Sequence, residues 1–306
     1  MDLNVIKRHI LSLKLITFVS VLLLSACGDS SSDGSEGQTF VNALDFPDPA
    51  LRDCVETAVQ VNEWTSLSEI THLECEDAGI QSAEGVELLL NLTYLVLQDN
   101  PLASIDLSAN VKLEALWLQG NQLTDINVAY NTDLTTLILA GNNLTEIDLS
   151  NNTYLMALVV DGSQILSIDL SNNTWLTDLY LNGCGIESID LRNNAALISL
   201  QLAYNSLTSI DLSNNIELKG LYLSENSLTN IELNNNTALT YLDLSSNDLT
   251  SSLDLNQLTQ LEYLDVSGNP FNSLDEGTGD DDAPSPVIPV RGGGGFGLVI
   301  NLPIDN

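Results

Sequence analysis

A segment of 21 residues recurs in phase through the middle of this 306-residue chain. The first copy, LTYLVLQDNPLASIDLSANVK, begins at Leu92. Later copies begin at Leu113, Leu134, Leu155, Leu176, Leu197, Leu218, Leu239 and Leu261; the copy at Leu239 has 22 residues, and the last is truncated. A fixed period over this length indicates one elongated solenoid, in which each repeat adds a layer to a common core, rather than two globular domains.

Within each copy, Leu recurs at places 1 and 4, an aliphatic residue at place 6, Asn at most ninth places, and an Ile-Asp-Leu type triplet at places 14 to 16. Places 3 to 7 alternate between outward and inward positions, which predicts a strand. Places 14 to 16 alternate again and predict a second short strand on the other side. This pattern is that of a leucine-rich repeat. We predict a curved, right-handed arc with a parallel sheet on its concave face, short strands or turns on its convex face and a helical N-terminal cap.

Asparagine forms two columns, at place 9 and at place 19. A buried Asn amide can both donate to and accept from the backbone of neighbouring turns, so we interpret both columns as structural. Ser163 and Cys184 occupy place 9 in two copies, and each keeps a hydrogen-bond donor. Cys184 is therefore expected to be a buried substitute rather than a nucleophile, since no His is near it in sequence.

Residues 1–26 have a basic start, an apolar run from Leu15 to Leu24 and the ending Leu24-Ser25-Ala26 before Cys27. This is the pattern of a secretory signal and is too short for a transmembrane helix. Residues 24–27 resemble a bacterial lipobox, which implies cleavage before Cys27 and acylation of that cysteine. The alternative is an ordinary signal peptide that leaves a free thiol. Residues 27–43, rich in Gly, Ser and acidic residues, predict a flexible tether.

Residues 44–91 predict an N-terminal cap. Pro49 opens a helical pattern to Val61, a second short helical piece is expected near Ser66 or Ser68, and Ile70 begins a degenerate first repeat. Cys54 lies on the capping helix and Cys75 points inward from the first strand. Because disulfides persist in exported proteins, we predict a Cys54 to Cys75 bridge; two buried free thiols are the alternative.

The cap, with FPDPALRDCV before the first strand and AGIQSAEGVELLLNL leading into the repeats, resembles the cap of internalin-like bacterial leucine-rich repeat proteins. Its cysteine pair resembles that of Gram-negative lipoprotein relatives. This resemblance covers roughly residues 44–274 and implies a binding role without chemical activity. It implies a protein exported and lipid-anchored in a Gram-negative cell envelope, with the outer membrane favoured.

After the repeats of residues 92–274, residues 275–306 are acidic and rich in Pro and Gly. This composition predicts a disordered tail. The alternative is that the apolar FGLVI segment covers the last exposed strand.

The chain has 8 Lys plus Arg against 42 Asp plus Glu, a net charge of −34. Such a surface repels phosphate backbones, so we expect no nucleic-acid partner. After the leader, the only histidine is His72, which we expect on the cap surface, and no catalytic constellation forms around it. We therefore predict a non-enzyme without cofactors or metal.

The outward places 3 and 5 predict an exposed apolar and aromatic stripe on the concave face. Such stripes often mark interaction sites, although aromatic and β-branched residues also simply suit strands. The predicted partner-binding residues are Tyr94, Val96, Trp117, Ile138, Val159, Tyr180, Tyr222, Tyr241 and Tyr263, with Trp117 and Tyr180 as the main anchors.

Acidic residues also form a column at place 15, from Asp106 to Asp254. A calcium ladder and a solvated polar face are both open interpretations. The function we favour is binding of a protein partner, preferably basic, by a monomer. The alternatives are glycan binding through Trp117, Tyr180 and Tyr222, and a structural envelope spacer stabilised by cations.

Overall fold

The structure is a computed structural model that describes residues 46–251 and 253–271, all within one compact unit, Ser35–Asn306. The predicted signal peptide, tether and tail lie outside these residues. The helices are α3 (Pro49–Asn62) and the 3-10 helices η1 (Leu67–Glu69) and η2 (Val86–Leu88). The strands are β1 (His72–Glu74), β2 (Tyr94–Val96), β3 (Ala115–Trp117), β4 (Thr136–Ile138), β5 (Ala157–Val159), β6 (Asp178–Tyr180), β7 (Ser199–Gln201), β8 (Gly220–Tyr222), β9 (Tyr241–Asp243) and β10 (Tyr263–Asp265).

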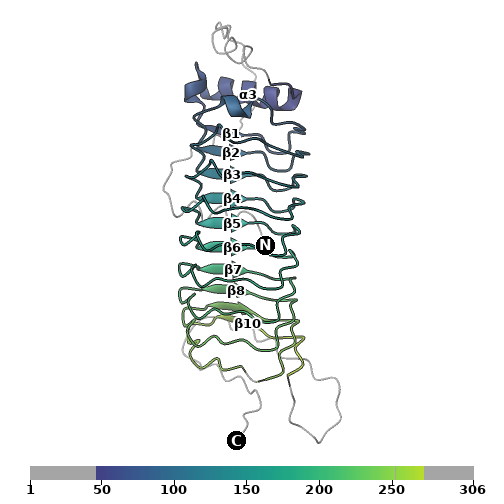
Figure 1. Ribbon diagram of the computed structural model, residues 1–306, viewed down its shortest axis with the longest axis vertical. Helices are drawn as coiled ribbons and strands as arrows, with labels where there is room; N and C mark the ends of the chain where they lie inside the picture. Colours follow the sequence, from purple (N-terminus) through teal and green to yellow (C-terminus); the bar gives the residue numbers. More distant parts are fainter. Residues whose placement is uncertain (1–45, 252, 272–306) are drawn as a thin grey trace, which may run out of the picture. The chain divides into compact units, whose positions relative to one another are not determined.

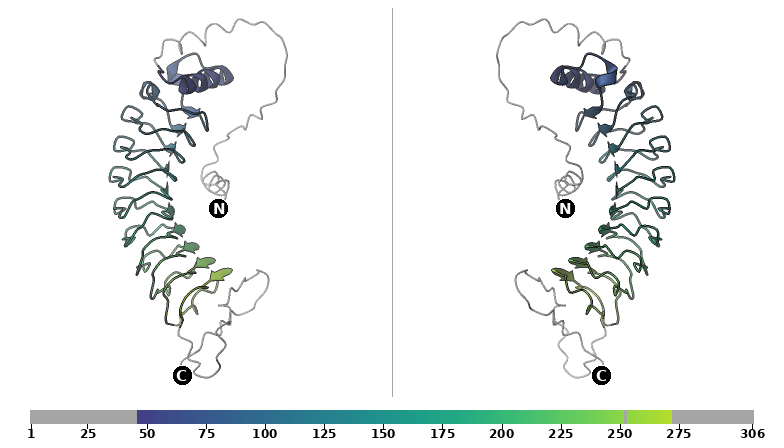
Figure 2. Two further views of the ribbon diagram at one scale, coloured as in Figure 1. Left: turned by 90° about the vertical axis from the view of Figure 1, so that its right-hand side faces the viewer. Right: turned by 90° about the vertical axis from the view of Figure 1, so that its left-hand side faces the viewer.

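The ten strands form one parallel sheet in chain order (Figure 1). Neighbouring strands pair in register one repeat apart, so that Leu116 of β3 lies between Leu95 and Leu137. Among the helices and strands, the most extensive contacts are those between strands that follow each other in the chain. Figure 2 shows the repeats following an arc, with the strands along its inner side and the loops splayed along its outer side. The predicted solenoid with a parallel sheet on the concave face is confirmed.

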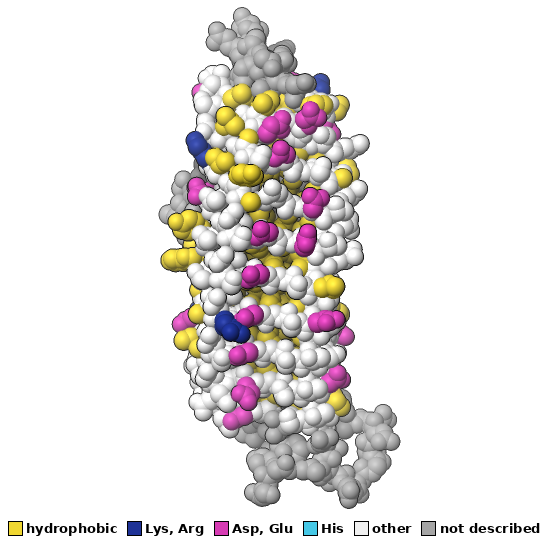
Figure 3. Space-filling view, in the orientation of Figure 1, with side chains coloured by type: hydrophobic (Ala, Val, Ile, Leu, Met, Phe, Trp, Pro, Cys, Tyr) yellow, Lys and Arg dark blue, Asp and Glu magenta, His cyan; other side chains and the backbone are white. Residues whose placement is uncertain are grey.

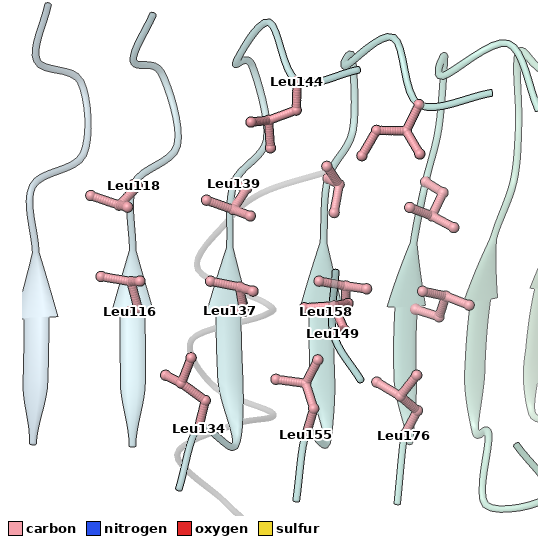
Figure 4. Close-up of a cluster of buried hydrophobic side chains, with 14 of the residues drawn as sticks. Leu116, Leu118, Leu134, Leu137, Leu139, Leu144, Leu149, Leu155, Leu158 and Leu176 are labelled. Atoms are coloured by element: carbon pink, nitrogen blue, oxygen red, sulfur yellow. The ribbon is translucent and has the colours of Figure 1, made fainter. Parts of the chain in front are cut away.

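The core lies between the sheet and the convex loops. Leucines from places 1, 4, 6, 11 and 16 point into it and stack on their equivalents in the next repeat, as Figure 4 shows for Leu134, Leu137 and Leu139. These three side chains are fully buried. Full burial of a Leu stabilises a fold by roughly 1.5–3 kcal/mol, so the repeated leucines supply most of the driving force for stacking.

The convex face consists of turns and irregular backbone, one of the two forms predicted for it, and the second strand expected at places 14 to 16 does not form in the described repeats. The arc separates successive turns on the convex side more than on the concave side, which opposes direct backbone pairing there. Side chains bridge that gap instead. The Nδ2 atoms of Asn151, Asn172, Asn193, Asn214 and Asn235 each donate to a carbonyl of the preceding turn.

The ninth-place asparagines form the predicted ladder. Asn226 is representative: its Nδ2 donates to the carbonyls of Leu202 and Leu223, at 2.9 and 3.0 Å, and also to Ser224. Its Oδ1 accepts the amide of Leu207 at 3.0 Å. One side chain thus satisfies backbone groups in two turns, which keeps the tight buried bend free of orphaned groups.

The asparagines at place 19 make the predicted donor hydrogen bonds but not the predicted acceptor hydrogen bonds. Each Nδ2 donates to two carbonyls, as Asn215 does to Leu191 and Asn194 at 3.1 and 2.9 Å. The Oδ1 atoms accept no hydrogen bond from the described residues, and this holds for Asn110, Asn131, Asn152, Asn173, Asn194, Asn215 and Asn236. This column therefore satisfies acceptors of neighbouring turns but not their amides.

The ninth-place ladder is interrupted in two adjacent turns. The Cys184 thiol is buried and donates to the Val160 carbonyl at 3.4 Å, as predicted for a ladder substitute. Burial raises the pKa of this thiol to about 11, so it is protonated and unreactive at neutral pH. The prediction for Ser163 is wrong, because its buried hydroxyl has no partner within the described chain. Serine is shorter than asparagine and does not span the turn.

The cap begins with helix α3, close to the predicted range. Its apolar face, Leu51, Val55 and Val59, is buried and packs on β1. The predicted Cys54–Cys75 disulfide is present and joins the helix to the first repeat. The ring of His72, expected at the surface, is instead half-buried and lies edge-on to Trp64, with ring centroids 5.0 Å apart.

The disulfide provides a direct test of how firmly the cap is held. Cys54→Ser with Cys75→Ser should lower the free energy of unfolding by about 3 kcal/mol, because the bridge closes a loop of 21 residues in the unfolded chain. Denaturant unfolding with and without reductant measures the effect. Reductant should destabilise the natural chain and leave the double variant unchanged; an equal response of both would contradict the role given to this bridge.

Asp48 connects the start of α3 to the degenerate first repeat. One carboxylate oxygen accepts the amides of Ala50 and Leu51, at 2.9 and 3.1 Å, as a helix N-cap. The other accepts the amides of Gln81 and Ser82, at 2.8 and 3.0 Å. The side chain is only 9% exposed. Burial alone would raise its pKa, but the four amide hydrogen bonds together hold that pKa below its ordinary value.

Candidate protein-binding surface

The concave face is built by places 3, 5 and 7 of the repeats, whose side chains stand on the solvent side of the sheet. Strand pairing brings equivalent places side by side, about 4.8 Å apart. The predicted residues therefore do form one continuous surface. Its two halves differ in exposure.

In the half formed by β2 to β6, the side chains on the concave face are tightly packed and largely shielded from solvent. Val96, Trp117, Ile138 and Val159 form a hydrophobic cluster of their own, separate from the main core, and Tyr94, Ala140 and Tyr180 pack against it. Trp117 keeps only 6% of its surface, and the ring of Tyr94 lies edge-on to it at 6.1 Å. We expected this stripe to be exposed, and that expectation is wrong, since neighbouring side chains on the concave side cover one another.

Polar side chains bound this cluster. Gln98 and Gln119, both 5% exposed, are hydrogen-bonded to each other. Asp161 accepts the amide of Asn182 at 2.7 Å, and Asn182 in turn accepts the amide of Ala203 at 2.8 Å. Burial raises the pKa of Asp161. These side chains continue the hydrogen bonding of the sheet past the ends of the strands.

At β6 and β7 the side chains on the concave face are more exposed to solvent. Tyr180 is half-buried, and its hydroxyl donates to Asp178 at 3.4 Å and accepts from Ser199 at 3.3 Å. Desolvation raises the pKa of Tyr180 to about 12, so its hydroxyl remains protonated. Of the two predicted anchors, Tyr180 therefore presents accessible surface, whereas Trp117 is nearly covered.

The half formed by β8 to β10 carries a stack of three half-buried tyrosines. The ring of Tyr222 lies 4.4 Å from that of Tyr241, and the ring of Tyr241 lies 4.1 Å from that of Tyr263, nearly parallel at 6°. Sequence reasoning named all three residues but not their stacking. The sequence feature that could have predicted the stacking is Gly220. A Cβ atom at this position would lie 3.2 Å from the ring of Tyr222, so glycine leaves the space that this ring occupies.

Beside the tyrosines lie Asp243 and Asp265, direct neighbours in the ladder. In each, one oxygen accepts both the amide and the hydroxyl of the serine two residues on, Ser245 and Ser267, at 2.6 to 3.0 Å. The carboxylates are therefore held in place on the surface. Desolvation and the charge of Asp243 raise the pKa of Tyr222, and desolvation raises that of Tyr241, so the rings stay neutral.

The place-15 column lies on the convex face, where Figure 3 shows acidic side chains recurring from repeat to repeat. These aspartates are exposed, and each accepts the amide two residues on, as Asp148 does from Ser150 at 2.9 Å. Hydrogen bonds from the side chain and from the backbone amide of Ser150 hold the pKa of Asp148 below its ordinary value. Asp190 also pairs with Arg192 at 2.9 Å. Within the described residues, no group of three or more His, Cys, Asp or Glu side chains is placed to hold a metal ion.

The stacked parallel strands, the leucine core and the asparagine ladder define a leucine-rich repeat fold. The family profile described as "Leucine Rich repeat" matches residues 172–193 and 235–252. No curated protein matches the chain significantly. None of the helices in the described part is long and apolar enough to cross a membrane.

Solved structures similar to this chain include leucine-rich repeat proteins of two bacteria. It is 35% identical to the functional domain of InlJ from Listeria monocytogenes, with a TM-score of 0.71, over 75% of this chain and 52% of that one. It is 25% identical to a leucine-rich repeat protein of Leptospira interrogans, with a TM-score of 0.58, over 63% of this chain and 53% of that one. The chain thus spans about half the length of these two relatives.

A third similar structure is a complex of Latrophilin 3, Unc5D and the leucine-rich repeat protein FLRT2. There the identity is 26% and the TM-score 0.51, over 60% of this chain and 64% of that one. The chain therefore shares a scaffold that is typical of protein-interaction modules.

Proposed function

We propose that this chain is a non-catalytic protein of the bacterial cell envelope that binds a protein partner through its concave face. The observation that carries the proposal is that large aromatic side chains collect on this face although the hydrophobic core is complete without them. Aromatic residues are enriched in the energetic centres of protein interfaces. The rigid sheet holds them in place before binding, so little backbone entropy is lost on association.

Two further observations support this proposal. The InlJ domain and FLRT2 share the fold, and FLRT2 occurs in a complex with other proteins. The sequence of residues 1–27 supports export and acylation at Cys27, which would anchor the solenoid at a membrane, the outer membrane being favoured. Acyl chains contribute roughly 0.8 kcal/mol for each buried CH₂, so two or three chains would give stable attachment.

The glycan interpretation has less support in the geometry. Sugar stacking requires an accessible ring face, but Trp117 is 6% exposed and both faces of Tyr241 are covered by neighbouring tyrosines. The spacer interpretation does not explain the three stacked tyrosines on the concave face, although exposed aromatic residues such as Tyr154 and Trp175 also occur outside that face. Protein binding accounts for the half-exposed tyrosines of β6 and of β8 to β10.

The test is capture of a partner from envelope extract and from neighbour-cell or host-cell lysate by the purified protein. Ser199→Phe with Ser224→Phe would block the concave face without adding charge, because both side chains are half-exposed there. Thr208→Phe with Thr229→Phe is the matched control, since both threonines are exposed in the same two repeats but outside the concave face. A protein retained by the natural chain and the control but lost by the blocked variant is expected. Equal retention by all three, at equal thermal stability, would contradict the proposal.

A further inference from the structure

The tyrosines and aspartates of β8 to β10 form one compact platform. The three rings stack across the strands, with Tyr222 lying over Gly220 of its own strand. Asp265 lies two residues after Tyr263 on the same face of β10, roughly 6.6 Å along the strand. A column of aromatic rings and a pair of carboxylates thus lie side by side on the solvent side of the sheet.

Within the described residues, the stack ends at Tyr263. Tyr241 has a ring neighbour on each side, but β10 is the last strand of the described sheet, so no further described strand lies beyond Tyr263. A flat cation placed there would continue the stack, because the face of an aromatic ring attracts positive charge.

The two carboxylates lie on neighbouring strands, and this arrangement favours a cation close to them. Asp243 and Asp265 are paired directly across the ladder, where like charges destabilise each other. Neither forms an ion pair within the described residues, and the hydrogen bonds from the two serines use one oxygen of each. Residues 197–271 contain nine acidic residues and a single basic one, Lys219. The repeats themselves therefore offer almost no positive charge to relieve this repulsion.

We propose that this platform, formed by Tyr222, Tyr241, Tyr263, Asp243 and Asp265, binds an arginine-bearing segment of a protein partner. The guanidinium group stacks on the outer face of Tyr263 and donates to the carboxylate of Asp265, and Asp243, one strand further in, attracts the same positive charge. Arginine fits better than lysine because its planar fork both stacks on a ring and bonds a carboxylate through two N–H groups. The inference rests on the proposed function, since it names the chemistry of the partner that binds the concave face.

The experiment measures fluorescence anisotropy of labelled peptides that alternate glycine with arginine, lysine or citrulline, titrated with the purified protein. Citrulline keeps the planar group of arginine without its charge, and lysine keeps the charge without the plane. We expect the arginine peptide to bind several-fold more tightly than the lysine peptide and the citrulline peptide to bind most weakly. Equal binding of the arginine and lysine peptides would overturn the stacking part of the proposal.

The matched variants are Asp243→Asn with Asp265→Asn on the platform and Asp148→Asn with Asp169→Asn on the convex face, which remove the same charge. Asn keeps the oxygen that accepts the serine amide, so both turns should persist. The platform variant should weaken arginine-peptide binding by about 10-fold or more, and Tyr263→Ala by about 5-fold, whereas the convex variant should change it less than about 2-fold. Equal losses in the two aspartate variants would show diffuse attraction to the acidic surface and overturn the proposal.

Partner capture separates this inference from the proposed function. If the platform variants leave peptide binding unchanged while Ser199→Phe with Ser224→Phe still abolishes capture, the concave face remains the binding surface and only the arginine chemistry is overturned. If peptide binding responds as expected but the blocked variant still retains the partner, the platform binds cations without serving the proposed function, and the partner assignment fails.

Discussion

Asp48→Ala is expected to lower the free energy of unfolding of the cap by about 5 kcal/mol, the largest effect of any single substitution considered. The carboxylate accepts four backbone amides, two from α3 and two from the turn at Gln81 and Ser82. Its removal leaves these amides without an acceptor at a nearly buried site, and each hydrogen bond to a charged group contributes about 1.5 kcal/mol or more. Hydrogen exchange of the α3 amides would measure the loss.

The charge of Asp48 also makes the stability of the cap depend on pH. Because the folded-state pKa lies below the ordinary value of about 3.9, the stabilisation is fully present above that value and is lost as the pH falls through the lower folded-state pKa. Asp48→Asn should abolish this part of the acid sensitivity and be less destabilising than Asp48→Ala. Unchanged acid sensitivity in Asp48→Asn would show that other carboxylates control it.

The second large effect is expected for Asn226→Ala, which should cost about 4 kcal/mol. This side chain makes three donor bonds and one acceptor bond, all to backbone groups in two turns, and is 8% exposed. Leaving such buried groups unpaired costs about 1 kcal/mol or more for each. Denaturant unfolding of the variant measures the change.

Asn215→Ala is the matched comparison for Asn226→Ala, because it lies in the adjacent repeat at the other turn. Its Nδ2 makes two bonds, and its Oδ1 accepts none from the described residues. We expect about half the cost of Asn226→Ala. Equal costs for the two variants would mean that side-chain volume, rather than hydrogen bonding, sets the contribution of both columns.

The 21-residue period was enough to predict the strands, their register, the leucine core and the ninth-place ladder, because each follows from which residues recur at which spacing. The helix from Pro49 and the Cys54–Cys75 bridge followed from local signals in the cap. The role of Asp48 was missed, although an acidic residue directly before a proline that opens a helix is a known N-cap signal. Its second pair of amides comes from a turn over thirty residues away, which no local pattern reveals.

Other features depend on curvature, which the repeat pattern does not specify. The arc crowds the inner side, so Trp117 and Val159 are buried where exposure was expected. The same arc spreads the outer side, so places 14 to 16 form no second ladder. The tyrosine stack depends on the rotamer that places the Tyr222 ring over Gly220. The missing hydrogen bond at Ser163 arises because the serine side chain is one bond shorter than that of asparagine. Sequence spacing identifies such positions but not the direction in which their side chains point.

The extensive contacts between elements of this solenoid join consecutive strands, and this has an evolutionary consequence. An in-frame duplication or deletion of one whole repeat in the gene leaves every remaining interface between turns intact, provided that the cap is kept. Recombination between repeats of equal length is therefore tolerated by the fold. Such an event would move the cap and the tyrosine platform apart or together by one layer and would leave the residues at each end unchanged.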